Sequence, residues 1–100
     1  MSDDERYLVV KGRRWRRQDP SLPEGVAERL LSHLGRGRSG VAAARRSGED
    51  QAPYRRRVDL AKHGLGERGT RWWEQSDAER DRRWTEALHD LDALDDQGEA

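Results

Sequence analysis

The sequence predicts an α+β fold that is mainly helical, with an N-terminal β-hairpin, an antiparallel αα-hairpin and an acidic amphipathic helix near the C-terminus. Its 100 residues give room for one domain with one small core. Apolar residues recur with helical spacing in three segments, and a short apolar run near the N-terminus has the pattern of a strand. We expect a single domain over residues 1–100, with its body in residues 7–74 and its last helix in residues 76–95.

A short β-hairpin is predicted from residue 7 to residue 17. Its two strands flank Lys11-Gly12, which has the length of a two-residue hairpin turn. Leu8 then lies opposite Trp15 and shares a face with Val10. Because an isolated two-stranded hairpin is unstable in water, we expect this apolar face to pack against the helices.

One long helix is predicted over residues 22–46. Ser21 and Glu24 have the spacing of a capping box, which satisfies free amides at a helix start. The apolar stripe that begins at Val26 keeps its phase through the glycine-rich residues 35–40, so we expect the helix to continue there. Each glycine costs roughly 1 kcal/mol relative to alanine, and a break within this segment is the alternative.

A second helix is predicted after a connector at residues 47–53. Apolar side chains recur along it with helical spacing, at Tyr54, Val58, Ala61 and Leu65. A glycine C-cap at Gly64 or Gly66 ends this helix. The short link makes the two helices an antiparallel αα-hairpin.

The stretch from residue 67 to residue 74 has no helical period and contains Trp72 and Trp73. Neighbouring side chains of an extended chain point in opposite directions, so we expect one ring to be buried and the other to be at least partly exposed. A second capping box, Ser76 with Glu79, opens the last helix. The face opposite its apolar stripe is almost entirely acidic, and the stripe is formed by Trp84, Ala87 or Leu88, Leu91 and Leu94.

Composition limits the function classes that this chain fits. It contains 18 arginines and two lysines but no cysteine, phenylalanine, isoleucine or asparagine, which is typical of a GC-rich genome. The arginine count alone is therefore poor support for nucleic-acid binding. Without cysteine there is no disulfide framework, thiolate metal site or thiol nucleophile. No apolar run exceeds four residues, which excludes a membrane span or signal-peptide core, and we expect a cytoplasmic bacterial protein.

Charge is unevenly distributed along the chain, although the formal net charge is zero. Residues 1–75 carry 17 basic and 11 acidic side chains, whereas residues 76–100 carry 3 basic and 9 acidic ones. The interpretation that we favour is an acidic segment that folds against a basic surface. The alternative is a basic face that meets an anionic partner while the acidic tail regulates access to it.

The sequence predicts a protein that is not an enzyme and that has no cofactor or small-molecule substrate. It has no nucleophile elbow or phosphate-binding loop, and the G-x-G-x-x-G outline at residues 35–40 does not follow a predicted strand. A chain this small and polar rarely encloses a deep cleft. His33, His63 and His89 lack the spacing of metal ligands, so we expect surface or boundary histidines.

Several short motifs follow one another along the chain, namely Lys11-Gly12-Arg13-Arg14-Trp15-Arg16, Asp19-Pro20, Leu22-Pro23, Gly66-Glu67-Arg68-Gly69 and Trp72-Trp73-Glu74. In these motifs the chain resembles a family of small bacterial proteins over about residues 7–74. The family has no established activity, so the resemblance implies a fold rather than a function. The glycine-rich segment at residues 35–40 and the acidic C-terminal helix depart from the family's pattern.

The main functional prediction is an interaction module that binds another protein or a second copy of itself. Tryptophan and arginine are the residues found most often at interface hot spots. The predicted docking residues are Trp72, Trp73, Arg68 and Arg71. Binding to a membrane surface is not expected, because the strongest amphipathic helix has an acidic polar face.

The alternative prediction is a nucleic-acid-associated protein. Guanidinium groups bind phosphates through paired hydrogen bonds, and an exposed aromatic ring stacks on a base. The residues with this chemistry are Arg13, Arg14, Trp15, Arg16 and Arg17 on the hairpin and Arg55, Arg56 and Arg57 on the second helix. A purely structural interpretation places Trp15 in the core and the arginines over aromatic rings or beside carboxylates.

Overall fold

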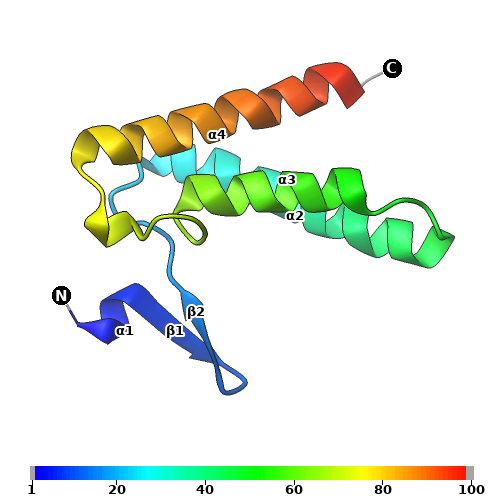
Figure 1. The fold of residues 1–100 in the computed structure, drawn as a ribbon. Coiled ribbons are helices and arrows are strands. Elements are labelled where there is room, and N and C mark those ends of the chain that lie inside the picture. The colour runs from blue at the N-terminus through cyan, green and yellow to red at the C-terminus, as the bar shows by residue number, and fades with distance from the viewer. Residues whose placement is uncertain (1, 99–100) are drawn as a thin grey trace.

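The computed structural model describes residues 2–98, with side chains through residue 96. Three long helices pack together, and a small β-hairpin projects from one side of this bundle (Figure 1). The predicted α+β, mainly helical fold is confirmed. In chain order the elements are α1 (Asp3–Arg6), β1 (Tyr7–Val10), β2 (Arg13–Arg16), α2 (Glu24–Ser47), α3 (Ala52–Leu65), the 3-10 helix η1 (Trp72–Glu74) and α4 (Asp77–Gly98).

The helices α2 and α3 form the predicted antiparallel αα-hairpin, and α4 runs back along α3 (Figure 1). α2 is continuous through its glycine-rich segment, so the prediction of one long helix is confirmed. Gly48 caps the C-terminal end of α2 with φ at 77°, and Gly66 caps that of α3 with φ at 87°. Glycine adopts this left-handed conformation without strain, which lets both helices stop abruptly.

Two glycines of α2 allow α3 to approach closely. A Cβ atom at Gly37 would lie 2.7 Å from Cγ2 of Val58 and 3.1 Å from the Val58 amide nitrogen. A Cβ atom at Gly40 would overlap the ring of Tyr54. Gly35 lies on the same helix but faces open space, with no atom within 4 Å of an added Cβ. The glycines therefore differ in role, and only those facing α3 are needed for packing.

Replacing Gly37 with alanine is expected to destabilise the fold by about 1–3 kcal/mol, because the methyl group would press on the backbone of α3. Replacing Gly35 with alanine is expected to stabilise the fold by about 0.5–1 kcal/mol through helix propensity alone. Urea unfolding followed by far-UV circular dichroism measures both changes. Stabilisation by both substitutions would contradict the close contact of the helices.

The hydrophobic core lies where α2, α3 and α4 meet. Each helix contributes most of the apolar face that its spacing predicted, and Leu30, Leu65 and Leu91 are fully buried, one from each helix. Tyr54, which was predicted on the stripe of α3, is 36% exposed instead and lies against Gly40 of α2. Full burial of a leucine side chain contributes about 1.5–3 kcal/mol, so these positions dominate the stability of a small core. The buried cluster consists of Leu30, Leu34, Ala61, Leu65, Ala87, Leu88 and Leu91.

The two predicted capping boxes have different outcomes. The second is confirmed, because the amide of Ser76 donates to Oε1 of Glu79 at 2.8 Å and the amide of Glu79 donates to Oγ of Ser76 at 3.2 Å. The first is wrong, because α2 begins at Glu24 without a side-chain cap. The hydroxyl of Ser21 donates instead to Oδ1 of Asp19 at 2.7 Å. A nearby carboxylate is a strong acceptor and holds this hydroxyl away from the helix start.

The hairpin has the predicted register, with Leu8 opposite Trp15. Its predicted packing is wrong, because Val10 is 44% exposed and Trp15 is 41% exposed. The buried core cluster contains none of the hairpin residues that the structure describes. An apolar face of the hairpin thus stays largely open to solvent.

The hairpin is attached to the bundle through other contacts. The ring of Tyr7 packs edge-on against that of Trp73, with 5.6 Å between ring centroids. The guanidinium of Arg16 donates to the carbonyl of Gly69 at 2.9 Å and to that of Gly66 at 3.3 Å. These contacts give the two strands the tertiary support that an isolated hairpin lacks.

Candidate functional site

The two tryptophans predicted as a docking point lie in different environments on η1. Trp72 is 1% exposed, and its Nε1 donates to the carbonyl of Arg17 at 3.0 Å. Trp73 is half-buried, and its ring packs edge-on against that of Trp72, with 5.1 Å between ring centroids. The prediction of one buried and one partly exposed ring is confirmed. The ring of Trp72 belongs to the interior, so a docking surface does not include it.

The two arginines predicted beside these rings have carboxylate partners. Arg68 donates to Oδ1 of Asp59 at 2.8 Å, and Arg71 donates to Oε2 of Glu74 at 3.2 Å. All four side chains in these pairs are about half exposed. Exposed ion pairs are weak, about 0–1 kcal/mol, so both arginines remain free to exchange partners.

The hairpin arginines lie over aromatic rings or bond to main-chain carbonyls. The guanidinium of Arg13 lies 4.6 Å from the centroid of Trp15, and that of Arg14 lies 4.0 Å from the centroid of Tyr7. Arg17 donates to carbonyls of the N-terminal segment, and Arg16 to those of the 66–69 loop. Within residues 2–96, none of these four forms an ion pair with a carboxylate. Arg13, Arg14 and Arg16 thus lie over aromatic rings, as the structural interpretation expects, whereas Arg17 is held by main-chain carbonyls instead.

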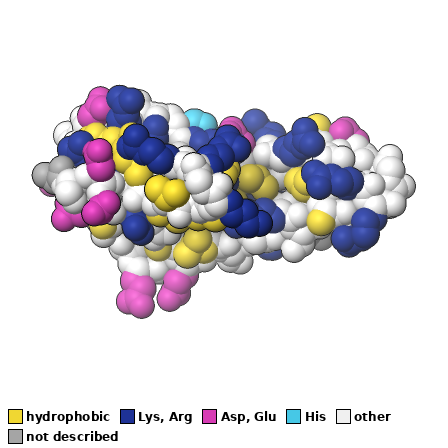
Figure 2. Space-filling model, turned by 90° about the horizontal axis from the view of Figure 1, so that it is seen from below, with side chains coloured by type: hydrophobic (Ala, Val, Ile, Leu, Met, Phe, Trp, Pro, Cys, Tyr) yellow, Lys and Arg dark blue, Asp and Glu magenta, His cyan; other side chains and the backbone are white. Residues whose placement is uncertain are grey.

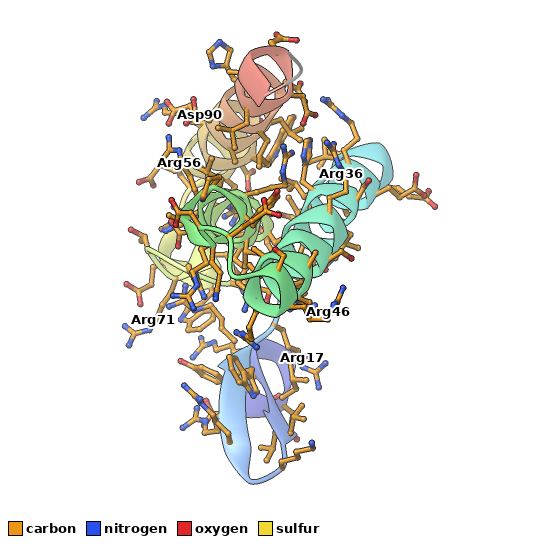
Figure 3. The ribbon with its side chains drawn as sticks, turned by 90° about the vertical axis from the view of Figure 1, so that its right-hand side faces the viewer. Arg17, Arg36, Arg46, Arg56, Arg71 and Asp90 are labelled. Carbon is orange, nitrogen blue, oxygen red and sulfur yellow. The ribbon has the colours of Figure 1, made fainter. Side chains whose placement is uncertain are left out.

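The three successive arginines of α3 point in different directions. Arg57 points into the bundle and donates to Oδ1 of Asp95 at 2.7 Å. Arg56 is exposed on the outer side of α3, on the side toward α4 (Figure 3). Arg55 lines a groove between α2 and α3. Successive helical residues are turned by 100°, so a run of three arginines does not form one patch.

A network of arginines and carboxylates joins α4 to the other two helices. Asp95 accepts hydrogen bonds from Arg36 and Arg57. These hydrogen bonds, chiefly the one from Arg36, lower the pKa of Asp95 to about 2. Arg29 donates to Oδ2 of Asp92 at 2.6 Å. The favoured interpretation, in which the acidic segment folds against a basic surface, is confirmed by these ion pairs.

His33 lies inside this network and is 6% exposed, which corrects the expectation of a surface or boundary histidine. Arg57 only donates, so Nδ1 of His33 accepts its hydrogen bond at 2.8 Å, and Nε2 carries the proton toward Asp92. Burial, and then the positive charge of Arg57, lower the pKa of His33. The ring is therefore neutral at pH 7.

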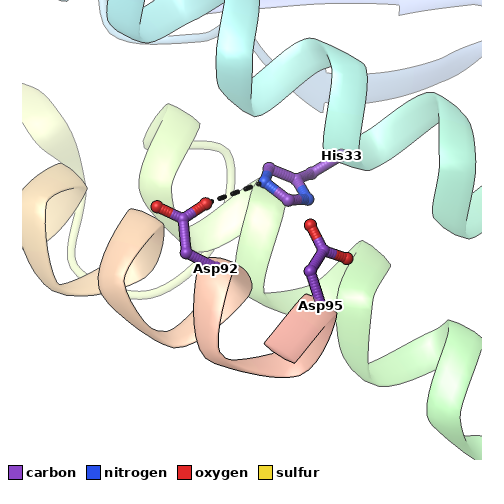
Figure 4. Close-up of side chains that lie close together, drawn as sticks. All are labelled: His33, Asp92 and Asp95. Carbon is purple, nitrogen blue, oxygen red and sulfur yellow. Dashed lines mark ion pairs between the residues drawn. The ribbon is translucent and has the colours of Figure 1, made fainter. Parts of the chain in front are cut away.

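His33, Asp92 and Asp95 also form a group whose ligand atoms lie within 4.8 Å of one another (Figure 4). This spacing would suit a metal ion, which the sequence spacing did not indicate. The ligand atoms are already engaged by guanidinium groups, and a cation entering the group would have to displace them. The chemistry of this group is that of an ion-pair network, and we assign no metal to it.

The neutralising effect of α4 reaches only one side of the helical hairpin. Arg36 lies on the side of α2 that faces α4, where it bonds to Asp95, and Arg46 lies near the end of α2, farther from α4 in this view (Figure 3). Arg38 on α2 makes no ion pair with any carboxylate in residues 2–96, whereas Arg68 pairs with Asp59. The ion pairs of α4 thus engage Arg29, Arg36 and Arg57 but not Arg38.

Six residues linked by a ring contact, by electrostatic interaction or by the lining of one groove form a group that we call the cationic face. Lys62 lies 5.4 Å from the centroid of Trp15 and connects the hairpin to the helices. Burial, and then the charge of Arg68, lower the pKa of Lys62, and Arg38 acts in the same direction. Figure 2 shows this side, with acidic side chains mainly toward the end that holds the N-terminal segment. The cationic face comprises Arg13, Trp15, Arg38, Arg55, Lys62 and Arg68.

A groove between α2 and α3 occupies part of the cationic face. Its volume is about 380 Å³, at the low end of the range for small-ligand sites. Val41 and Val58 provide apolar lining, and the charged lining residues are Arg38, Arg55 and Arg68. Arg55 donates to Oε1 of Gln51 at 2.8 Å, which is a neutral partner. The groove therefore combines an apolar lining with cations that are only weakly engaged.

Sequence reasoning missed Arg38, Val41 and Lys62 as members of this surface. Val41 belongs to the apolar stripe of α2, and Arg38 lies three residues before it, so both side chains lie on the same side of the helix. This spacing could have identified both residues from the sequence. The contact of Lys62 with Trp15 depends on how the hairpin is attached, for which no sequence pattern was available.

Comparison with known proteins identifies no relative: no protein-family model, curated protein or solved structure matches the chain. The resemblance to a family of small bacterial proteins therefore stays a prediction. Within residues 2–98, no helix combines the length and apolar character that a membrane crossing requires. The surface is accordingly interpreted from its own chemistry.

Proposed function

We propose that the protein is a non-enzymatic interaction module that binds an anionic partner through the cationic face. The observation that carries this proposal is Trp15, which is 41% exposed and has Arg13 and Lys62 over its ring. Lys62 in turn interacts electrostatically with Arg38 and Arg68, which line the groove. Arginine and tryptophan are enriched at binding hot spots. A cytoplasmic location, which fits a chain without cysteine, is part of the proposal.

The arrangement of charge supports this proposal more strongly than the number of arginines does. A GC-rich genome accounts for many arginines but not for their separation into a neutralised side and an open side. Ion pairs with α4 hold Arg29, Arg36 and Arg57. The cationic face lacks such a partner element, and Asp59 and Glu67 are the acidic residues found to interact with its side chains. A surface of one sign attracts ligands of the opposite sign over a distance of several ångströms.

The predicted docking point at η1 has less support than the cationic face. Trp72 is buried, and the ring of Trp73 lies 4.8 Å from the guanidinium of Arg6. Of the four predicted docking residues, Arg68 is the one that the cationic face includes. Binding of a protein partner remains part of the proposal insofar as that partner is acidic.

Binding of a labelled heparin oligosaccharide, measured by fluorescence anisotropy at about 50 and about 200 mM salt, tests the proposal, because contacts to a polyanion weaken steeply over this range. Arg38→Glu is expected to reduce the affinity roughly tenfold at the lower salt concentration. Arg56→Glu is the matched control, since it makes the same change of charge on an exposed residue outside the cationic face. Equal losses in both variants, or no binding by the wild-type protein, would contradict the proposal.

A further inference from the structure

We infer that the anionic partner is a single strand of nucleic acid, in which one base stacks on Trp15 and the neighbouring phosphates contact Arg13, Lys62 and the arginines of the groove. This inference rests on the proposed function. It adds the class of ligand and the role of one aromatic residue.

The exposure of Trp15 needs an explanation that the fold does not supply. The residue lies in a strand whose partner and register are fixed, so its ring is held in a defined position. It lies outside the buried core cluster, and Arg13 and Lys62 lie over its ring at 4.6 Å and 5.4 Å from the centroid, so a base that stacks on the ring displaces one of these side chains. An exposed ring among cations is the combination by which proteins bind single strands, since every base has a face that stacks.

The groove supplies a second point of contact on the same surface. Its lining includes Val41 and Val58, which suit the flat apolar face of a base or a sugar. Arg38, Arg55 and Arg68 are placed to contact the adjoining phosphates through paired hydrogen bonds. Lys62 lies over the ring of Trp15 and interacts electrostatically with Arg38 and Arg68 of the groove, so the cations offer contacts to successive phosphates of a strand.

The chemistry of this face favours a single strand over the other polyanions. The bases of a duplex are stacked on one another and offer no free face to Trp15. A run of acidic side chains would satisfy the arginines but would leave the indole ring and the two valines without an apolar partner. A single strand alone complements all three features of the face, namely the ring, the apolar lining and the cations.

Fluorescence anisotropy with three labelled probes tests the inference: a thymidine oligonucleotide of about 12 nucleotides, a duplex of the same length, and a polyglutamate peptide of similar charge. The single strand is expected to bind at least tenfold more tightly than either of the others. Trp15→Leu is expected to weaken its binding by roughly 5-fold to 150-fold, and Trp15→Phe is expected to retain most of the affinity. Far-UV circular dichroism establishes that each variant is folded.

The salt dependence separates stacking from phosphate contact. Because stacking releases no counterions, Trp15→Leu is expected to lower affinity equally at about 50 and about 200 mM salt, whereas Arg38→Glu is expected to lessen the salt dependence itself. Heparin binding by the wild-type protein with no preference for the single strand, or with unchanged affinity in Trp15→Leu, would overturn the inference and leave the proposed function standing. Preferential binding of polyglutamate would assign the face to an acidic protein segment. Failure to bind any of the polyanions would overturn both.

Discussion

Replacing Asp19 with alanine is expected to destabilise the protein by about 3–5 kcal/mol, as is typical when one partner of a buried ion pair is removed. The side chain of Asp19 is fully buried, and its Oδ2 accepts a hydrogen bond from Arg83 at 2.8 Å. Its Oδ1 accepts hydrogen bonds from the amide and hydroxyl of Ser21 and lies 3.4 Å from Nη1 of Arg80. Without this carboxylate, two largely buried arginines would lose their counter-charge.

The effect is large because Asp19 joins three separate parts of the chain. It lies in the linker after the hairpin, its amide donates to the carbonyl of Leu65 at the end of α3, and Arg83 belongs to α4. Arg83 also donates to the carbonyl of Gly64 and to the side chain of Gln75. Loss of Asp19 therefore affects the junction where the linker, α3 and the start of α4 meet.

Urea unfolding followed by circular dichroism measures this change, with Asp59→Ala as the control. Asp59 also pairs with an arginine at 2.8 Å, but both partners are about half exposed, so the control is expected to cost less than about 1 kcal/mol. Similar losses in the two variants would show that the burial of Asp19 does not matter.

The pH dependence of stability gives an independent measure of the same residue. Burial alone would raise the pKa of Asp19, but hydrogen bonds from Ser21 and Arg83 outweigh it and hold the pKa below its ordinary value of 3.8. A carboxylate with a depressed pKa stabilises the fold fully above about pH 4, and this contribution is lost as the pH falls through the lower value of the folded state. In Asp19→Asn this part of the acid sensitivity is expected to be absent.

Replacing Trp72 with alanine is expected to cost about 3–5 kcal/mol, the usual range for removing a buried aromatic side chain. Trp72 is 1% exposed and lies between the end of the hairpin and the start of α4. Its Nε1 donates to the carbonyl of Arg17, which would lose its partner, and its ring supports Trp73 from the side. The substitution would therefore loosen the attachment of the hairpin as well as open a cavity.

Trp15→Ala is the matched control for this prediction, because it removes the same side chain from an exposed position. It is expected to cost less than about 1 kcal/mol, as most surface substitutions do. Far-UV circular dichroism in urea is the suitable measurement, since tryptophan fluorescence changes with the number of rings. Equal costs at the two positions would contradict the assignment of Trp72 to the interior and Trp15 to the surface.

The helices of this protein could be predicted from sequence because their apolar residues repeat in phase. The stripe of α2 keeps its period across the glycines, and Gly37 occupies a position on that stripe where a side chain would strike Val58. Gly37 and Gly40 weaken the isolated helix but let it pack closely against α3, whereas Gly35 has no such role. Periodicity gave the right answer because packing outweighs intrinsic propensity in this segment.

The contacts of single polar side chains could not be predicted in the same way. From the sequence, the hydroxyl of Ser21 could either cap the start of α2 or bond to a nearby side chain. In the structure it bonds to Asp19 and does not cap the helix. The apolar face of the hairpin was predicted to be buried, whereas the attachment is made by Tyr7 and Arg16 on the other face. Such choices depend on the relative position of elements that are distant in the chain.

The candidate site was predictable only in part. Arg13, Trp15, Arg55 and Arg68 were among the residues predicted from composition and motif. Their assembly into one surface depends on Lys62 and Arg38, which become neighbours through the packing of three elements. Charge along the chain indicated that α4 would offset the basic body, but not which arginines it would leave open.

The separation of charge between α4 and the cationic face also affects how the molecules meet one another. With no formal net charge and an isoelectric point near 6.8, the protein has no overall repulsion between copies at neutral pH. Local attraction between acidic and basic side chains of neighbouring molecules is therefore not offset by a net charge, and it is greatest at low ionic strength. Added salt screens this attraction, so we expect the protein to be more soluble under the same conditions that would weaken the proposed binding of a polyanion. On that proposal, a second copy of the protein would compete with the polyanion for the cationic face, to an extent set by the protein concentration.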